Sequence, residues 1–213
     1  MKIIEPYIGP IENMKYGEYL NLVETAARNC YNSQVSLTYD KSENFIRGLI
    51  KRGHESPLEF ANISVKIICS VYTLGQLTRH RLASFCVRSF RYCNLADRSK
   101  YQHGVEFIVP AGMTVDGIEV WKYQCEQAER AYFELLNRKF PPEVARSVLP
   151  SSAATSIIMG TNVREWRHIL KLRTDNHAQE DIRNLMKALL SQFKELYPVF
   201  FEDLCPMFSF EDL

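Results

Sequence analysis

The stretch NISVKIICSVYT, residues 62–73, decides what kind of fold the chain adopts. It is rich in β-branched side chains, and Lys66 interrupts an otherwise apolar run. β-Branched residues favour extended backbone, because their crowded Cβ atoms pack well on a pleated surface. The pattern therefore predicts a strand over residues 62–73.

Helical patterns lie on both sides of this strand. Before it, apolar residues at helical spacing predict a helix over Gly17–Cys30 and a second one that Ser42 caps and that ends near Gly53. After it, we expect a short helix over Leu74–Arg81 and extended backbone over Phe85–Tyr92. The remaining predicted helices span residues 119–140, 142–149, 162–173 and 179–197.

Strand material early in the chain and helices late in it predict an α+β fold, a mixed or antiparallel β-sheet covered by helices with a helical C-terminal half. Neither a repeat nor a Gly/Ser/Pro-rich linker interrupts the sequence. We therefore expect a single domain over residues 1–213.

The bulk composition limits the classes of function. The chain has a net charge of +1 and 46% hydrophobic residues, values that are ordinary for a globular protein and too neutral for a general nucleic-acid coat. Its beginning, MKIIEPYIGP, has no apolar core flanked by basic residues, and no apolar run approaches the roughly 18 residues of a membrane span. These features predict a cytoplasmic protein without a signal peptide.

The cysteines show no metal-binding or redox pattern. No C-x-x-C pair occurs, and none of them is paired with a histidine at metal spacing. We expect buried, reduced thiols and no structural metal. The cysteines are Cys30, Cys69, Cys86, Cys93, Cys125 and Cys205.

Two segments are locally basic although the whole chain is nearly neutral. Residues 79–100 contain six Lys or Arg and only Asp97 as an acid, and residues 164–173 contain four and only Glu165. Arginine clusters that lack acidic partners suit a phosphate from outside, because the guanidinium fork matches its oxygens. Such clusters can equally be a solvated basic face, or can find their partners elsewhere in the fold.

Helical spacing indicates which way the side chains of the second basic segment face. Arg164 and His168 are four residues apart and share a helix face, whereas Trp166 and Ile169 point to the core, so the basic side chains should face a cleft or solvent. His80 lies between two arginines, where its charged form is disfavoured. A neutral imidazole is therefore expected there.

Nucleophilic catalysis has little support. Ser89 has no obvious base and no G-x-S-x-G turn, which argues against a hydrolase triad. Nearby arginines would favour the thiolate of Cys86, but no histidine is placed to pair with it. No glycine-rich phosphate loop is present, so a nucleotide cofactor would be bound through side chains.

The segment RHRLASFCVRSFRY, residues 79–92, resembles the signature of flavin-dependent thymidylate synthases: Arg-His-Arg, seven residues, Ser, then Arg-Tyr. Three further segments resemble that family in the right order. They are GHESPLEF (53–60), ARSVLP (145–150) and TNVREWRHILKLRTDNHAQ (161–179). With the early AARNCYNS, the similarity extends from about residue 25 to 192.

The resemblance implies both a fold and a reaction. The fold would be like that of the thymidylate synthase complementing proteins. Members of the family convert dUMP to dTMP with 5,10-methylenetetrahydrofolate as carbon donor, and FAD reduced by NADPH supplies the hydride. No enzyme cysteine attacks the uracil ring. The family forms homotetramers whose active sites are shared between subunits.

The resemblance also implies roles for individual residues. Arg173 would be catalytic, stabilising negative charge on the uracil, as a permanently protonated guanidinium can. His54 and Glu59 would lie on the flavin or folate side. The residues implied to bind FAD are Ser56, Arg79, His80, Arg81, Val87, Asn162, Arg164 and His168. Those implied to bind dUMP are Gln76, Arg79, Val87, Ser89, Arg91, Arg146 and Arg173.

This chain departs from the family pattern next to Ser89. Cys86 and Val87 stand where polar residues are usual, and Phe90 replaces a Gln or Gly. Any polar contact at Val87 must come from its backbone. An alternative from another class is a nucleotide- or RNA-binding module that uses the arginines with Tyr92 and Tyr101 as stacking groups.

Overall fold

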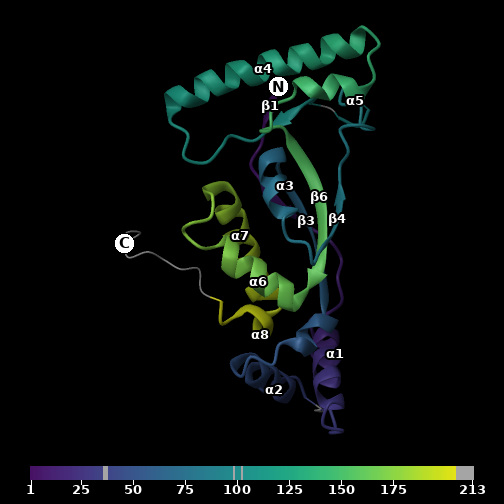
Figure 1. The fold of residues 1–213 in the computed structure, drawn as a ribbon, viewed down its shortest axis with the longest axis vertical. Coiled ribbons are helices and arrows are strands. Elements are labelled where there is room, and N and C mark those ends of the chain that lie inside the picture. The colour runs from purple at the N-terminus through teal and green to yellow at the C-terminus, as the bar shows by residue number, and fades with distance from the viewer. Residues whose placement is uncertain (36–37, 98, 102, 205–213) are drawn as a thin grey trace. The chain divides into compact units, whose positions relative to one another are not determined.

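The computed structural model describes residues 1–35, 38–97, 99–101 and 103–204 (Figure 1). Arg98 of the first basic cluster and Cys205 lie outside the described residues. The chain divides into two compact units, each built from separate stretches of sequence. The first unit is Met1–Gly9, Lys66–Arg79 and Phe85–Ile158, and the second unit is Pro10–Val65, His80–Ser84 and Met159–Leu213.

The strands form a four-stranded sheet and a short two-stranded one. The larger sheet has the order β2 (Tyr7–Gly9), β3 (Asn62–Ser70), β6 (Ala154–Asn162), β4 (Ser84–Val87). β2 pairs with β3 in antiparallel register, with Ile8 opposite Ile67. In the smaller sheet, β1 (Lys2–Ile3) pairs in parallel with β5 (Glu106–Phe107).

The strand predicted over residues 62–73 exists but is shorter. The first part of β3 alternates, with Ile63, Val65 and Ile67 buried and Lys66 exposed. It ends at Ser70, because the Ser70 hydroxyl accepts a hydrogen bond from the backbone N–H of Thr73 and so caps a helix. That helix, α3 (Val71–Leu77), begins three residues earlier than the predicted helix, and the Arg-His-Arg motif lies beyond its end.

Strand β6, the neighbour of both β3 and β4, was not among the predicted elements. Its buried residues alternate over Ile157, Met159 and Thr161, which is the period of a strand with one covered face. The strand also needs a glycine: a Cβ at Gly160 would come within 2.9 Å of the Ser64 hydroxyl on β3. Gly160 and Ser64 therefore belong to a close contact between strands β6 and β3.

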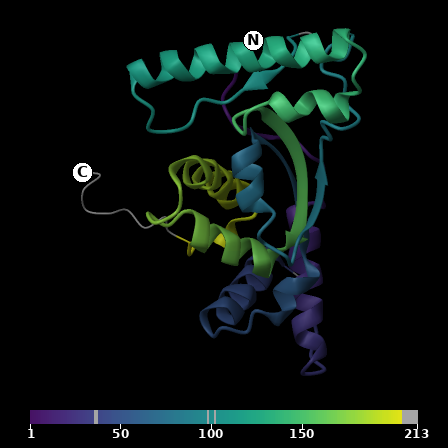
Figure 2. The ribbon, with the colours of Figure 1, turned by 45° about the horizontal axis from the view of Figure 1, so that its top comes forward.

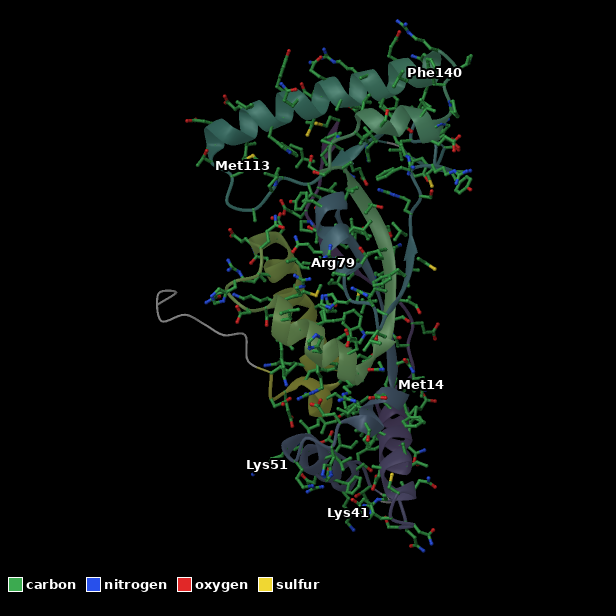
Figure 3. The ribbon with its side chains drawn as sticks, viewed as in Figure 1. Met14, Lys41, Lys51, Arg79, Met113 and Phe140 are labelled. Carbon is green, nitrogen blue, oxygen red and sulfur yellow. The ribbon has the colours of Figure 1, made fainter. Side chains whose placement is uncertain are left out.

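In the first unit, the long helix α4 (Val115–Asn137) packs against α5 (Pro142–Ala145) and the 3-10 turn η2 (Arg146–Val148), as both views show (Figure 2). The helix lies between the labelled Met113 and Phe140 (Figure 3). It begins four residues before the predicted start, because the Thr114 hydroxyl caps Gly117. Tyr132 is completely buried, and its hydroxyl accepts the N–H of Leu95.

The helices of the second unit come from both ends of the chain. They are α1 (Tyr16–Asn29), α2 (Tyr39–Lys51), the 3-10 turn η1 (Ser56–Phe60), α6 (Val163–Arg173), α7 (Glu180–Leu196) and α8 (Pro198–Phe201). Trp166 of α6 is fully buried, donates to the carbonyl of Ile63 and packs edge-on against Phe193 of α7. This contact joins α6 to β3 and to α7 within one apolar core.

One predicted helix start in this unit is wrong. α2 begins at Tyr39, so Ser42 lies inside the helix and does not cap it. The Ser42 hydroxyl donates instead to the carboxylate of Glu24 on α1, at 2.6 Å, where both groups are buried. The predicted end is correct: Gly53 follows α2 with a φ of +73°, a conformation that favours glycine.

The α+β fold class is confirmed, with an antiparallel strand pair in the sheet and long helices late in the chain. Among the described residues, no helix combines the length and the apolar character that crossing a bilayer requires.

Candidate active site

Helix α6 and the residue that caps it supply three of the predicted flavin residues of the second unit. Asn162 precedes the helix, and its Oδ1 accepts the backbone N–H of Glu165 at 2.9 Å, which caps the first turn. Arg164 and His168 follow on one exposed face, as their spacing predicted. All three line a cavity of about 640 Å³, a size in the range of pockets for small organic ligands.

Carboxylates from elsewhere in the second unit meet the arginines of this helix. Arg164 pairs with Glu59 and lies 3.8 Å from Glu55. Arg167 pairs with Asp203 at 2.7 Å and lies 3.7 Å from Glu55. For these two arginines, the partners are therefore supplied by the fold. The acids of GHESPLEF were visible in the sequence, but no local pattern places them beside α6.

Arg167 lines the same cavity as Arg164, as expected for a basic residue of α6, but it is buried and not open to solvent. Its side chain is only 3% exposed, and it donates to the carbonyl of Phe200 as well as to Asp203. A buried guanidinium needs such bidentate partners, because an unpaired one would lose its hydration without compensation. Arg167 thus ties the segment around α8 to α6.

The three residues of the Arg-His-Arg motif have different environments. Arg79 and Arg81 are exposed, whereas His80 between them is only 6% exposed. Figure 3 labels Arg79 just beyond α3. The Thr161 hydroxyl at the end of β6 donates to the carbonyl of Leu82 and so holds the loop between α3 and β4. Neither arginine makes an ion pair within the described part of the chain.

His80 is neutral, as predicted, but for a different reason. Burial lowers the pKa of His80 to about 4, with smaller contributions from Arg173 and His168 and not from the two flanking arginines. The Nε–H of Arg173 donates to Nε2 of His80 at 3.0 Å. Because Nε2 accepts this bond, the single ring proton must be on Nδ1. The exposed neighbours Arg79 and Arg81 point their charges into water instead.

His80, Glu165 and His168 form the group of side chains in the described residues whose spacing could suit a metal ion, with ligand atoms within 4.8 Å of one another. The hydrogen bond from Arg173 opposes such a site. A metal on Nδ1 of His80 would move the ring proton to Nε2, where it would face the N–H of Arg173. The cluster is better suited to holding Arg173 than to holding a cation.

The predicted dUMP residues other than Arg173 all belong to the first unit. Val87 ends β4 and is 40% exposed, and Ser89 begins a turn in which its hydroxyl accepts the N–H of Arg91. The prediction of extended backbone through Tyr92 is wrong beyond Val87, because this Ser-centred turn ends the strand. Gln76 lies in α3, and Arg146 begins η2.

Two of these residues meet at one glutamate. Arg91 donates to the carboxylate of Glu143 at 2.9 Å, and the Nε of Arg146 lies 3.4 Å from the Glu143 carbonyl. Arg91 and Glu143 are each about half exposed, so water screens their pairing. An exposed pair of this kind is readily exchanged for a phosphate group.

The remaining predicted residues of the second unit lie near η1. Ser56 begins this turn and lines a cavity of about 410 Å³ together with His54 and Arg164. Glu59 lies in the same turn and lines the larger cavity. The segment GHESPLEF therefore borders both cavities of the second unit that Arg164 also lines.

The cysteines only partly fit the expectation of buried thiols. Cys69 and Cys125 are buried, and burial raises the pKa of Cys69 to about 12. Cys93 is half-buried, while Cys30 and Cys86 are exposed, the first after the end of α1 and the second on the edge strand β4. Within the described residues the Cys86 thiol makes no hydrogen bond, which gives it no base to activate it.

Comparison with known proteins decides the family. The profile described as "Thymidylate synthase complementing protein" matches residues 14–199. The chain belongs to this family. It is 30% identical to a flavin-dependent thymidylate synthase of Kosmotoga olearia over 95% of this chain and 91% of that protein. The counterpart from Mycolicibacterium vanbaalenii is 31% identical, over 85% of this chain and 78% of the relative.

Other relatives agree with this assignment. A probable flavin-dependent thymidylate synthase of Mycobacterium phage L5 is 28% identical over 94% of this chain and 84% of that protein. The UMP/dUMP methylase PolB from Streptomyces cacaoi, solved with 5-Br dUMP, has the same fold, with a TM-score of 0.78, 22% identity and coverage of 95% and 96% of the two chains. The chain is thus an enzyme of the flavin-dependent thymidylate synthase kind, which argues against the RNA-binding alternative.

Proposed function

We propose that this enzyme converts dUMP to dTMP, with 5,10-methylenetetrahydrofolate as carbon donor and NADPH-reduced FAD as hydride source, and without a cysteine nucleophile. We further propose that it acts as a single domain in the cytoplasm, in a homotetramer whose subunits share active sites. The strongest support is the cavity of the second unit, which brings together Asn162, Arg164 and His168 of the family's Asn-x-Arg segment.

The lining of this cavity suits a flavin ring. Arg164, Arg167 and Lys171 are balanced by Glu55, Glu59 and Glu165, so the cavity has donors and acceptors without a strong net charge. A neutral ring system with polar edges is recognised by such a mixed lining. FAD would supply the hydride when bound, and Asn162, Arg164 and His168, with Ser56 and the Arg-His-Arg motif, would orient it.

The residues of the first unit suit a nucleotide phosphate and its base. Arg79 is exposed and without an ion-pair partner in the described chain, and Arg91 is held by a single solvent-exposed carboxylate. These guanidinium groups can take up phosphate oxygens at little cost. Ser89, Gln76, Arg146 and the backbone of Val87 would complete the contacts to dUMP. Ser89 is then a ligand and not a nucleophile.

Arg173 would be the catalytic residue. Its guanidinium stays protonated at every working pH, so it offers fixed positive charge where the uracil ring develops negative charge. The bond from its Nε to His80 orients this charge before substrate arrives. Preorganised charge of this kind stabilises a transition state more than charge that must first reorient.

The test is flavin content and tritium release. Purified enzyme is expected to be yellow, and to release tritium from 5-tritiated dUMP only when NADPH and methylenetetrahydrofolate are both present. Omitting each in turn provides the control. Colourless protein that FAD does not reconstitute, or release that proceeds without the folate, would contradict the proposal.

A further inference from the structure

His80 lies between two side chains of helix α6. The Nε of Arg173, in the last turn, donates to its Nε2 at 3.0 Å, and the Oε1 of Glu165, in the first turn, lies 3.9 Å from its Nδ1. His80 and Glu165 are both largely buried, at 6% and 9% exposure. His168, on the intervening turn, packs edge-on against the His80 ring with centroids 6.4 Å apart.

The bond from Arg173 requires one tautomer of His80. If the proton were on Nε2, two N–H donors would face each other and the bond would be lost. The ring must therefore carry its proton on Nδ1. In water neither nitrogen is compelled to hold the proton, so the surroundings have to select it.

Glu165 is placed to make that selection. Among the described residues, the carboxylate that lies near Nδ1 of His80 is that of Glu165, whereas Arg173 and His168 offer positive charge or a ring. The separation of 3.9 Å is longer than a hydrogen bond, so the attraction is that of a carboxylate for an N–H dipole in a poorly solvated place. A carboxylate there favours the proton on Nδ1 over the proton on Nε2.

We propose that Glu165 is a positioning residue: it keeps the proton of His80 on Nδ1, so that Nε2 remains the acceptor that orients the guanidinium of Arg173. This inference rests on the proposed function, in which Arg173 contacts the uracil. The relay of Glu165, His80 and Arg173 belongs entirely to the second unit. Helix α6 supplies Glu165 and Arg173, and the loop after α3 supplies His80.

The helix explains why the relay is rigid. Asn162 caps the turn that carries Glu165, and Trp166 next to it is fully buried. At the far end, Thr174 follows Arg173, and its hydroxyl donates to the carbonyl of Leu170. The two ends of α6 are therefore held at a constant separation, and His80 spans the space alongside.

The first experiment reads the tautomer directly, without reference to turnover. Nitrogen-15 NMR of histidine-labelled enzyme distinguishes the two neutral forms, and His80→Gln identifies the His80 signals among the five histidines. We expect the Nδ1–H form in the wild type and a shift toward the Nε2–H form in Glu165→Leu. Glu180→Leu removes an exposed carboxylate from the first turn of α7 and is the matched control, expected to change nothing.

The second experiment measures catalysis with the same variants. Glu165→Leu is expected to lower kcat for dUMP roughly tenfold with unchanged flavin content, the rate equivalent of losing about one net hydrogen bond. Glu165→Gln should restore most of the rate, because its amide oxygen can still face Nδ1. Glu180→Leu should match the wild type.

The outcomes separate the two proposals. A wild-type His80 in the Nε2–H form, or a Glu165→Leu enzyme that keeps both the wild-type tautomer and the wild-type kcat, would overturn the role of Glu165. Wild-type enzyme that makes no dTMP would overturn the proposed function and leave the NMR result to decide the tautomer.

Discussion

The two units hold their basic side chains in different ways. In the first unit, Arg91 meets Glu143 in an ion pair whose side chains are 55% and 47% exposed. In the second unit, Arg173 is bonded to a His80 that is 6% exposed, and Arg167, 3% exposed, is clamped by Asp203. Exposed pairs contribute little and exchange easily, whereas buried ones fix geometry.

This difference matches the two roles that we propose. Side chains that take up a diffusing nucleotide phosphate benefit from partners that are easily replaced. A side chain that must meet developing charge in one geometry benefits from a buried support. Arg164 is the exception in the second unit, since its pair with Glu59 is about half exposed, and it resembles Arg91 in this respect.

The largest effect is expected at the buried support. Arg173→Ala should lower kcat by about 10²–10³-fold, the usual cost of removing one preorganised donor to developing charge. Flavin content should stay at the wild-type level, because the role that we propose for Arg173 is contact with the nucleotide. Steady-state assays of dTMP formation with absorbance spectra of the purified variant provide both readings. A variant that turns over normally but binds folate weakly would assign Arg173 to a different role.

The next effect concerns pH. The pKa of His80 is lowered from 6.5 to about 4, so the unfolded chain takes up its proton first and folded stability falls as pH drops from about 6.5 to about 4. A pKa shift of this size corresponds to about 3 kcal/mol of folding free energy. This stability is fully present above pH 6.5 and is lost as the pH falls to about 4. Urea unfolding at fixed protein concentration should show this extra acid loss in the wild type and not in His80→Gln. Equal losses in both proteins would show that another group titrates.

A matched pair of arginine variants compares the exposed pairs of the two units. Arg91→Ala should raise KM for dUMP about 10- to 100-fold, the equivalent of one charge-assisted hydrogen bond, while the enzyme stays yellow. Arg164→Ala should weaken FAD by a similar factor and leave KM for dUMP unchanged once FAD is saturating. Fluorescence titration of FAD and initial rates against dUMP separate the two constants. If both variants changed FAD affinity and KM for dUMP in the same way, the proposed division of roles between the two units would be wrong.

The smallest effect is expected at Cys86. Because this exposed thiol has no hydrogen-bond partner in the described chain, Cys86→Ala should keep kcat within about twofold. Complete loss of turnover with FAD still bound would revive a cysteine nucleophile.

Local patterns predicted elements better than they predicted boundaries. The helices around Val23 and Trp166 were visible because their apolar residues repeat at helical spacing, and β3 because its β-branched residues cluster. The predicted start of α2 and the predicted end of β3 were each wrong because of a single hydroxyl group. Ser42 meets the carboxylate of Glu24 instead of capping α2, and Ser70 caps α3 and so ends β3.

For the candidate site too, local patterns predicted the residues but not their long-range partners. The family motifs named Asn162, Arg164, His168 and Arg173, and helical spacing placed Arg164 and His168 on a common face. The acids that meet Arg164 and Arg167 are more than thirty residues away, so no local pattern could pair them. Glu165 was visible only as the single acid of a basic segment, and its nearness to His80 required the fold.

The sequence by itself thus determined the family, the set of chemical groups and the approximate order of helices and strands, because these depend on residue identity and on short-range periodicity. Only the tertiary structure decided which arginines are paired and which side of His80 carries the proton. Ion pairing and burial depend on contacts between segments far apart in the chain, here the loop around His80, the turn at Glu59 and the helix that ends at Arg173.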